Sequence, residues 1–256
     1  MEPMTIREIM DAVGGKLLGE FGDINRMVGR VETDSRTIHS GSLFIPLVGE
    51  RFDGHAYINA ALEGGAAGCF TQRERESYLP GKFYIKVDST QRALRDLAKY
   101  YKKKFPIPVV ALTGSVGKTT TKDMVAAVLG EKYRVLKTEG NLNNEIGVPM
   151  TLLRLSGEHE IAVLELGMNH AGEIDYLSAL VEPDVVLMTN IGDSHIEHFG
   201  SREKILEAKS EIFHHVKSGA FVVINGDDPL LNTLPGKLPY AFTRVGAGEG
   251  LDYRAE

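Results

Sequence analysis

A glycine-rich loop at residues 114–120 carries residue types that bind phosphate. It follows an apolar run at Val109–Leu112 and precedes a helical pattern at Thr121–Leu129. Backbone N–H groups of such a turn, together with the start of the helix, hold phosphate oxygens. We therefore expect a nucleotide-binding loop made of Gly114, Ser115, Val116, Gly117, Lys118, Thr119 and Thr120.

Two side chains of this loop have specific expected roles. Lys118 is expected to reach the β- and γ-phosphates, and the Thr119 hydroxyl to ligate Mg²⁺. The spacing departs from the usual motif, because two residues rather than four separate Gly114 from Gly117. A glycine turn that only caps a helix is the alternative. The absence of an Asn-Lys-x-Asp element disfavours a GTP-binding protein.

Glu165 and His195 are further candidates for metal binding. Glu165 ends the apolar run that begins at Ile161, where a carboxylate could hold a metal ion or a water molecule. His195 lies in a polar loop after another apolar run. Because Mg²⁺ prefers oxygen ligands, the alternative for His195 is a loop histidine that only makes hydrogen bonds.

Lys209 falls on the apolar stripe of a helix predicted over Ser201–Val216, between Ile205 and Ile212. A lysine at such a position either extends to water or stays buried as an amine of lowered pKa. A neutral amine can react with CO₂ to give a carbamate, which is an oxygen ligand for a metal. The residue pattern leaves both possibilities open.

Short apolar runs that alternate with helical stretches must position these residues. The runs are Val109–Leu112, Ile161–Leu164, Val185–Met188 and Ala220–Ile224, with a weaker one at Arg134–Leu136. This alternation is typical of βαβ units with strands buried in a parallel sheet. Polar residues follow each of the four main runs, and ligands bind at the carboxyl edge of such sheets. The predicted fold class is α/β with a mostly parallel sheet.

A domain boundary is predicted at Phe105–Pro108. Before it, Arg92–Lys104 has a helical period, and the prolines stop that helix. Weaker patterns predict strands at Leu43–Leu47 and Phe83–Val87 and a helix at Ala56–Glu63. We predict a small α/β domain over residues 1–106 and a P-loop domain over residues 107–256.

Composition narrows the class of protein. The 256 residues are 25% charged and 43% hydrophobic, as in ordinary globular proteins. The net charge is −6, and residues 107–256 carry 21 Asp and Glu against 13 Lys and Arg, which disfavours a nucleic-acid surface there. The single cysteine, Cys69, the lack of a visible signal peptide and the lack of an apolar run near ~18 residues predict a cytoplasmic protein without a membrane span.

Four stretches together resemble the Mur ligases of bacterial cell-wall synthesis. They are Thr113–Thr120, Glu139–Pro149, Glu165–Ile174, and Asn190–His195 continuing to Ala208–Lys209. The shortened phosphate loop is this family's own form. Asp34–Arg36, Gly41–Phe44 and Asp53–His55 resemble the UDP-binding domain of two branches of the family. The resemblance runs over nearly the whole chain and is closest to the branch that adds D-alanyl-D-alanine.

The resemblance implies an ATP-dependent amide-bond ligase. ATP would phosphorylate the free carboxylate of UDP-N-acetylmuramoyl-tripeptide, and the amine of D-alanyl-D-alanine would attack the acyl phosphate. Two Mg²⁺ ions are implied, one held by Thr119 and Glu165, the other by Glu165, His195 and a carbamylated Lys209. With Lys118, the last three residues would form the catalytic group.

The same resemblance implies where the substrates bind. Asn143 and Asn144 would face the peptide, and Asn225 and Asp228 would lie near the adenosine. Ser35 and Arg36 would hold the UDP end, where the arginine fork suits phosphate.

The resemblance also sets expectations for the chain as a whole. We expect it to stop inside the ATP-binding domain, to lack the third domain that closes over ATP in this family, and to be inactive alone. A monomer without a nucleic-acid partner is expected. The alternatives are a sibling ligase that adds a single amino acid, a folylpolyglutamate-type ligase, and a nucleotide-binding module without catalysis.

Overall fold

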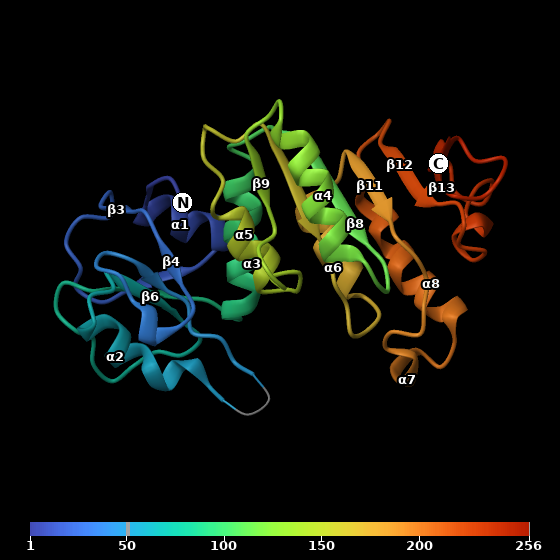
Figure 1. Ribbon diagram of the computed structural model, residues 1–256. Coiled ribbons are helices and arrows are strands. Elements are labelled where there is room, and N and C mark those ends of the chain that lie inside the picture. Colours follow the sequence, from blue (N-terminus) through green and yellow to red (C-terminus); the bar gives the residue numbers. More distant parts are fainter. Residues whose placement is uncertain (50–51, 256) are drawn as a thin grey trace. The chain divides into compact units, whose positions relative to one another are not determined.

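The chain folds around separate sheets in two units, and the structure, a computed structural model, describes residues 1–49 and 52–255 (Figure 1). Unit 1 consists of Met1–Phe105 and Leu152–Ser156, and unit 2 of Pro106–Thr151 and Gly157–Glu256. The short second segment belongs with unit 1 because Leu155 is buried there and its carbonyl accepts a hydrogen bond of 2.6 Å from Tyr101. No pattern in the sequence predicts that return.

Unit 1 contains a five-stranded sheet of order β2-β7-β6-β5-β4, in which β2 is antiparallel to β7 and the other neighbours are parallel. β1 and β3 pair separately. The elements are β1 (Met4–Thr5), α1 (Ile6–Val13), β2 (Lys16–Leu18), β3 (Met27–Val28), β4 (Val31–Glu32), β5 (Leu43–Phe44), α2 (Ile58–Glu63), β6 (Gly68–Thr71), β7 (Phe83–Lys86) and α3 (Thr90–Lys102).

Four predictions in unit 1 differ from the structure at their ends. The strand predicted over Phe83–Val87 ends at Lys86. The strand predicted over Leu43–Leu47 stops at Phe44, because Pro46 has no N–H to continue the ladder. The helix predicted over Ala56–Glu63 begins as a 3₁₀ turn at Gly54–Tyr57 before α2. The α3 helix starts at Thr90, where the Ser89 side chain caps it, and so begins two residues before the prediction.

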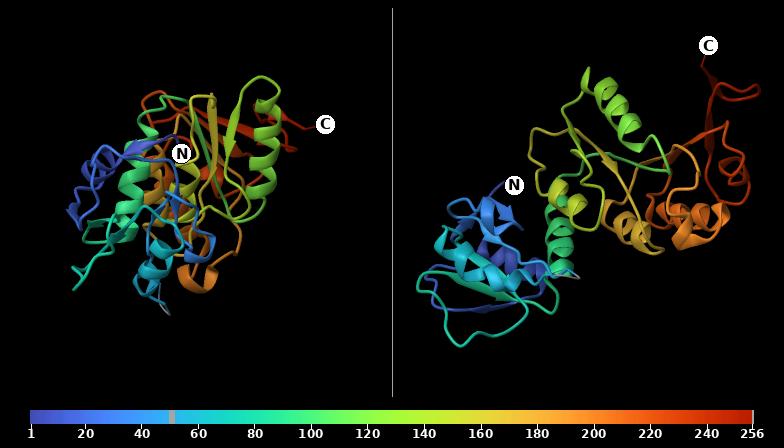
Figure 2. Two further views of the ribbon diagram at one scale, coloured as in Figure 1. Left: turned by 90° about the vertical axis from the view of Figure 1, so that its left-hand side faces the viewer. Right: turned by 60° about the horizontal axis from the view of Figure 1, so that its bottom comes forward.

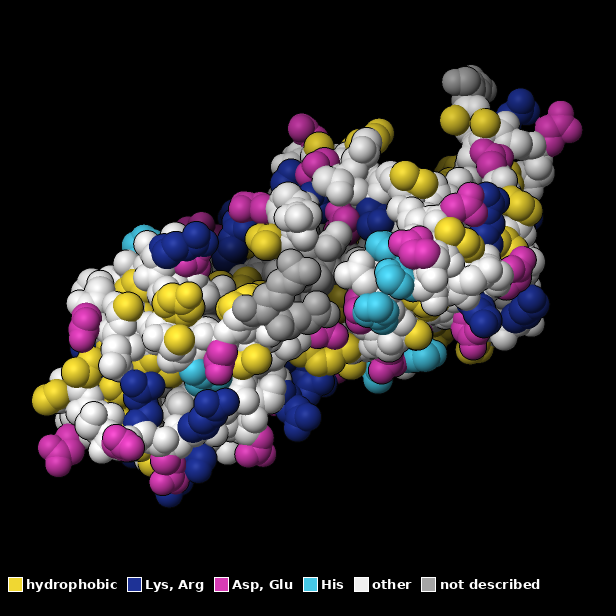
Figure 3. Space-filling view, turned by 90° about the horizontal axis from the view of Figure 1, so that it is seen from below, with side chains coloured by type: hydrophobic (Ala, Val, Ile, Leu, Met, Phe, Trp, Pro, Cys, Tyr) yellow, Lys and Arg dark blue, Asp and Glu magenta, His cyan; other side chains and the backbone are white. Residues whose placement is uncertain are grey.

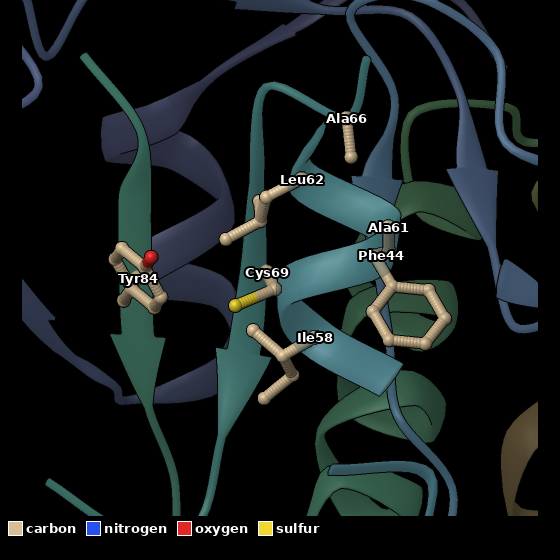
Figure 4. Close-up of a cluster of buried hydrophobic side chains, with 7 residues drawn as sticks. All are labelled: Phe44, Ile58, Ala61, Leu62, Ala66, Cys69 and Tyr84. Atoms are coloured by element: carbon tan, nitrogen blue, oxygen red, sulfur yellow. The ribbon is translucent and has the colours of Figure 1, made fainter. Parts of the chain in front are cut away.

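One hydrophobic cluster of unit 1 lies between α2 and the sheet. Ile58, Leu62 and Cys69 point toward one another there, with Tyr84 on the neighbouring strand (Figure 4). Cys69 has no exposed surface, and burial raises the pKa of its thiol to about 12. The thiol therefore acts as a small apolar side chain in this core.

Unit 2 contains a seven-stranded sheet of order β14-β13-β12-β11-β8-β10-β9, and every neighbouring pair is parallel. The α4 helix covers one face, and α6 and α8 cover the other (Figure 2). The elements are β8 (Val109–Thr113), α4 (Lys118–Gly130), β9 (Val135–Lys137), α5 (Gly147–Leu152), β10 (Ile161–Glu165), α6 (Glu173–Val181), β11 (Val185–Met188), α7 (Ile196–Phe199), α8 (Arg202–Ser210), β12 (Phe221–Asn225), β13 (Phe242–Gly246) and β14 (Tyr253–Arg254).

The five strands predicted from the apolar runs of this unit are confirmed as β8, β9, β10, β11 and β12. The predicted α/β class with a parallel sheet is also confirmed. The strand after the phosphate loop's helix is short, in keeping with its weaker pattern. No helix in the described part of the chain is both long and apolar enough to cross a membrane.

The single helix predicted over Ser201–Val216 is wrong in its second half. Ser201 caps α8 as predicted, since its side chain accepts from the Lys204 N–H at 3.3 Å. The α-helix ends at Ser210, and a 3₁₀ helix follows over Glu211–His215. Contacts with α6 hold this 3₁₀ segment, because the Glu211 carboxylate accepts hydrogen bonds from the N–H groups at the start of α6.

Candidate functional site

The phosphate loop follows β8, which lies between β10 and β11 in the sheet of unit 2. Both of its glycines are required by the backbone. Gly114 has φ +152°, and a Cβ there would lie 1.9 Å from the Thr189 Oγ1. Gly117 has φ +78° and forms the N-cap of α4. The α4 helix therefore begins at Lys118, three residues earlier than its apolar pattern predicts.

Lys118 folds back over its own loop. Its Nζ donates to the carbonyls of Gly114 at 2.8 Å and Ser115 at 3.2 Å. Burial lowers the pKa of Lys118, and the charge of Glu165 acts in the opposite direction. The ammonium and the N–H groups of the first turn of α4, which have no acceptor within the helix, make this helix start suited to an anion, and Thr120 lies exposed there.

Glu165 is fixed by three residues, one from α4 and two from the loop between β9 and α5. Its Oε2 accepts a hydrogen bond from the Thr119 hydroxyl at 2.9 Å, and its Oε1 accepts one from Asn143 Nδ2 at 2.8 Å. Its backbone N–H donates to the buried Thr138 hydroxyl at 3.0 Å. Glu165 is 1% exposed, so this carboxylate is held at the sheet edge beside the start of α4.

The two neighbouring asparagines differ in their contacts. The side-chain amide of Asn143 donates to Glu165, and the backbone carbonyl of Asn143 accepts from the Gly167 N–H at 2.8 Å. Asn144 uses its Oδ1 to accept from the Gly147 N–H at 2.8 Å, so it holds the start of α5. The family resemblance implies that both face a peptide, and the structure adds these contacts within the chain.

Lys209 is one of the largest fully buried side chains, with 1% of its surface exposed. The alternative in which it extends to water is therefore wrong. Burial and then the charge of Lys118 lower the pKa of Lys209 to about 7. Within the described residues its ammonium makes no hydrogen bond or ion pair, so a large fraction of this amine is neutral near pH 7.

His195 lies in the loop after β11 with φ +66°, which is uncommon for a residue other than glycine. Burial and the charges of Lys209 and Lys118 lower the pKa of His195, while Glu197 acts in the opposite direction. The structure therefore brings His195, Lys209 and Lys118 into one electrostatic neighbourhood. Histidine side chains gather on the face of unit 2 seen in Figure 3. His214 and His215 bond to Asp175 in the first turn of α6.

The predicted metal ligands fall into two groups. Thr119 and Glu165 present hydroxyl and carboxylate oxygens side by side, which is the donor chemistry that Mg²⁺ takes. His195 and Lys209 are neighbours, but an amine becomes an oxygen ligand only as a carbamate. In the described part of the chain, no three His, Cys, Asp or Glu side chains converge as metal ligands. The predicted set of metal ligands contains only two residues of those types, Glu165 and His195, so this finding does not contradict that set.

A cavity of about 400 Å³ lies at the carboxyl ends of β11, β12 and β13. Thr121 of α4, Thr189 and Asn225 are among its lining residues. Asp228 lies outside the lining: its carboxylate accepts from the N–H groups of Ile191, Leu230 and Leu231. Asn225 is thus placed on a cavity beside the phosphate loop, and Asp228 ties two loops of the same edge together.

The predicted UDP contacts lie in unit 1. Ser35 and Arg36 belong to a 3₁₀ turn that Asp34 caps. The Arg36 guanidinium forms two short contacts with the Asp34 carboxylate, including one of 2.6 Å from Nη2 to Oδ2. This exposed pair lowers the pKa of Asp34 to about 2. Arg36 is therefore presented to solvent with a carboxylate as its partner.

Sequence reasoning missed three residues that shape the site. Thr138 holds the backbone of Glu165, and Thr189 and Asn190 bond directly to the phosphate loop. A signal for the last two was present, since they are the first polar residues after the apolar run Val185–Met188. Thr138 likewise follows a strand, β9, but the apolar run that predicts this strand is weak.

Comparison with known proteins matches both units. Residues 112–255 match the Mur ligase middle domain, and residues 28–102 match the Mur ligase family catalytic domain. The UDP-N-acetylmuramoyl-tripeptide–D-alanyl-D-alanine ligase of Bacillus subtilis is 46% identical over 227 residues, which are 89% of this chain and 50% of that protein. The chain thus spans about half the length of the curated relatives it matches.

Two solved structures are similar over most of the chain. MurF from Acinetobacter baumannii is 36% identical with a TM-score of 0.90, over 98% of this chain and 55% of that one. MurF from Thermotoga maritima, solved in complex with ADP, is 36% identical with a TM-score of 0.79, over 87% of this chain and 51% of that one. The matched domains and the shared fold show that this chain belongs to the Mur ligase family.

Proposed function

We propose that this chain supplies the ATP-binding and UDP-substrate-binding parts of a ligase that joins D-alanyl-D-alanine to UDP-N-acetylmuramoyl-tripeptide. The observation that carries the proposal is the group formed by Lys118, Thr119 and Glu165 at the carboxyl edge of the unit 2 sheet. The names of the relatives describe this reaction and support the proposal. In the reaction, ATP phosphorylates a carboxylate, and an amine then displaces the phosphate to form an amide bond.

The phosphate loop binds ATP in this proposal. Lys118 leaves the carbonyls of its own loop and pairs with the terminal phosphates, and the N–H groups from Gly117 to Thr120 bind the remaining oxygens. Ser115 and Val116 shape the loop, and Asn225 contacts the adenosine in the neighbouring cavity, with Asp228 fixing that loop. The ADP complex of the Thermotoga maritima relative supports nucleotide binding at this fold.

Mg²⁺, when bound, supplies positive charge that offsets the repulsion between the triphosphate and the substrate carboxylate. Thr119 and Glu165 would hold one ion. Glu165, His195 and a carbamylated Lys209 would hold the second. The carbamate forms when the neutral amine adds to CO₂ and releases a proton, and the buried, unpaired state of Lys209 supports that step.

The two ends of the UDP-linked substrate meet different parts of the chain. Ser35 and Arg36 hold the UDP end, for which Arg36 exchanges its Asp34 contact for phosphate oxygens. Asn143 and Asn144 contact the peptide end. The protein acts as a monomer in the cytoplasm in this proposal, and this chain alone does not turn over.

The test measures phosphate release from ATP in the presence of UDP-N-acetylmuramoyl-tripeptide and D-alanyl-D-alanine. It is run on this chain alone and on this chain supplemented with the C-terminal half of the Bacillus subtilis relative. Release is expected only in the supplemented mixture. Release with a single amino acid but not with D-alanyl-D-alanine would assign a sibling ligase, and ADP binding without any release would leave a nucleotide-binding module.

A further inference from the structure

The loop after β11 holds the phosphate loop by several hydrogen bonds. Asn190 Oδ1 accepts from the Val116 N–H at 2.9 Å, and the Asn190 carbonyl accepts from the Ser115 N–H at 3.0 Å. The Thr189 hydroxyl donates to the Val116 carbonyl at 2.7 Å. Both backbone groups of Val116 are therefore bound by two consecutive residues of another strand's end.

Side-chain packing contributes little at this point of the loop. The Val116 side chain is 60% exposed, so few apolar contacts fix its backbone. Gly117 follows with φ +78°. A glycine adopts positive and negative φ about equally well, so its own preference does not fix this conformation. The conformation at Val116 therefore depends on the hydrogen bonds with Thr189 and Asn190, whereas Lys118 and Ser194 bond to the carbonyl of Ser115.

These contacts also determine which N–H groups are free for a ligand. The N–H groups of Ser115 and Val116 point to Asn190, whereas those at the start of α4 have no partner within the helix. A loop with only two residues between its glycines can still form a phosphate site if its first two N–H groups serve to anchor it. Asn190 thus supplies the two acceptors that anchor the loop with this shortened spacing.

We propose that Thr189 and Asn190 are positioning residues of the phosphate loop, which fix Val116 so that the N–H groups of Gly117, Lys118 and Thr119 receive the β-phosphate of the nucleotide. The proposal rests on the proposed binding of ATP at this loop. It assigns neither residue a contact with the nucleotide. Their effect is on the affinity for nucleotides that carry a β-phosphate.

Calorimetry with Mg·ADP and with AMP tests this on the 256-residue chain. Thr189→Val and Asn190→Ala should each weaken Mg·ADP binding by about five- to tenfold, because each removes a hydrogen bond that fixes the loop. AMP binding should stay within about twofold in Asn190→Ala, since AMP has no β-phosphate and Asn190 lies outside the lining of the neighbouring cavity. Thr189→Ser keeps the hydroxyl and should restore Mg·ADP binding.

Thr233→Val is the matched control. The Thr233 hydroxyl also donates to a backbone carbonyl, that of Leu230 at 2.8 Å, but in a turn after β12. It should leave both affinities unchanged. Equal weakening of AMP and Mg·ADP binding by Asn190→Ala, or tighter Mg·ADP binding in Asn190→Ala, would overturn the proposal.

Amide hydrogen exchange separates this proposal from the proposed function. Without any nucleotide, the Val116 amide should exchange slowly in the wild type and faster in Asn190→Ala. Unchanged exchange would contradict the anchoring itself. If the wild-type chain binds no ADP while the Val116 amide responds as expected, the nucleotide assignment fails and the anchoring contact stands without its proposed use.

Discussion

The Thr119 hydroxyl donates a 2.9 Å hydrogen bond to Glu165, which joins the first turn of α4 to the carboxyl end of β10. Forty-five residues separate them in the sequence, yet the parallel pairing of β10 with β8 brings both to one edge. Because the Glu165 carboxylate is buried and bonded from both sides, its two oxygens have defined directions. A divalent cation that binds there meets oxygens already in place.

Replacement of this carboxylate should abolish the effect of Mg²⁺ on nucleotide binding. Glu165→Gln keeps the shape and can still accept from Thr119, so the fold should be retained. The expected result is that Mg²⁺ strengthens ADP binding in the wild type and has at least about tenfold less effect in the variant. Calorimetry with and without Mg²⁺ measures this. Glu160→Gln, at the other end of β10, is the control, and equal Mg²⁺ effects in all three proteins would exclude the assignment of Glu165.

Asn143 should act on the same quantity through Glu165. Asn143→Ala removes the 2.8 Å hydrogen bond to Oε1 and lets the carboxylate turn. Loss of such an outer partner lowers metal affinity by about 10- to 100-fold, so the Mg²⁺ concentration that gives half of the ADP enhancement should rise accordingly. Asn141→Ala, an exposed asparagine on the same loop, should leave it unchanged. A similar response of both variants would remove Asn143 from this role.

Lys209 should form a carbamate in the intact protein. With ¹³C-labelled bicarbonate, the wild type should give a carbamate carbonyl resonance in the NMR spectrum, and Lys209→Met should not. Lys122→Met is a matched control, since Lys122 is also buried but pairs with Asp123 at 3.4 Å. In the supplemented ligase assay, Lys209→Ala should lose activity and partly regain it with short carboxylates. Full activity of Lys209→Ala would exclude a metal-holding role.

Cys69 should make the stability of the protein fall at alkaline pH. Its thiol has a pKa of about 12 in the folded state against 9.0 when unperturbed, so between these values the folded chain keeps a proton that the unfolded chain releases. The free energy of unfolding then falls with rising pH, by about 1.4 kcal/mol per pH unit from this group. Cys69→Ala lacks that component, although it is less stable at neutral pH by about 1 kcal/mol because of the space left in the core.

Urea unfolding of both proteins between pH 7 and pH 11 measures the difference. The two curves of unfolding free energy should approach each other above pH 9, since lysines and tyrosines contribute equally to both. Curves that stay parallel would show that burial does not hold the thiol proton.

The strands of unit 2 could be predicted because burial on both faces requires continuous apolar runs, as at Val109–Leu112. The loop proposed to bind phosphate could be predicted because glycines, a lysine and a threonine in that order have few other uses. The ends of elements could not. The α4 helix begins at Lys118 because the preceding Gly117 takes a left-handed conformation, and the helix's apolar pattern carries no trace of that.

The partners of the site residues were also beyond the sequence. Nothing in the spacing of Asn143 and Glu165 indicates that their side chains meet, because the contact depends on the pairing of β10 with β8 and on the path of the loop after β9. Burial of Lys209 could be suspected from its apolar stripe, but its degree depends on helices packed from elsewhere. The positions of Thr189 and Asn190 in the sequence do not indicate that they bond to the backbone of Ser115 and Val116.

The central claim is that Lys118 and its loop bind nucleotide phosphate, and calorimetry of Lys118→Ala with Mg·ADP tests it most directly. The wild-type chain should bind Mg·ADP, and the variant should bind at least about tenfold more weakly because the charge-assisted contact is lost. Lys132→Ala, an exposed lysine just after α4, should bind like the wild type. Equal affinity of Lys118→Ala and the wild type, with both folded by circular dichroism, would contradict the account.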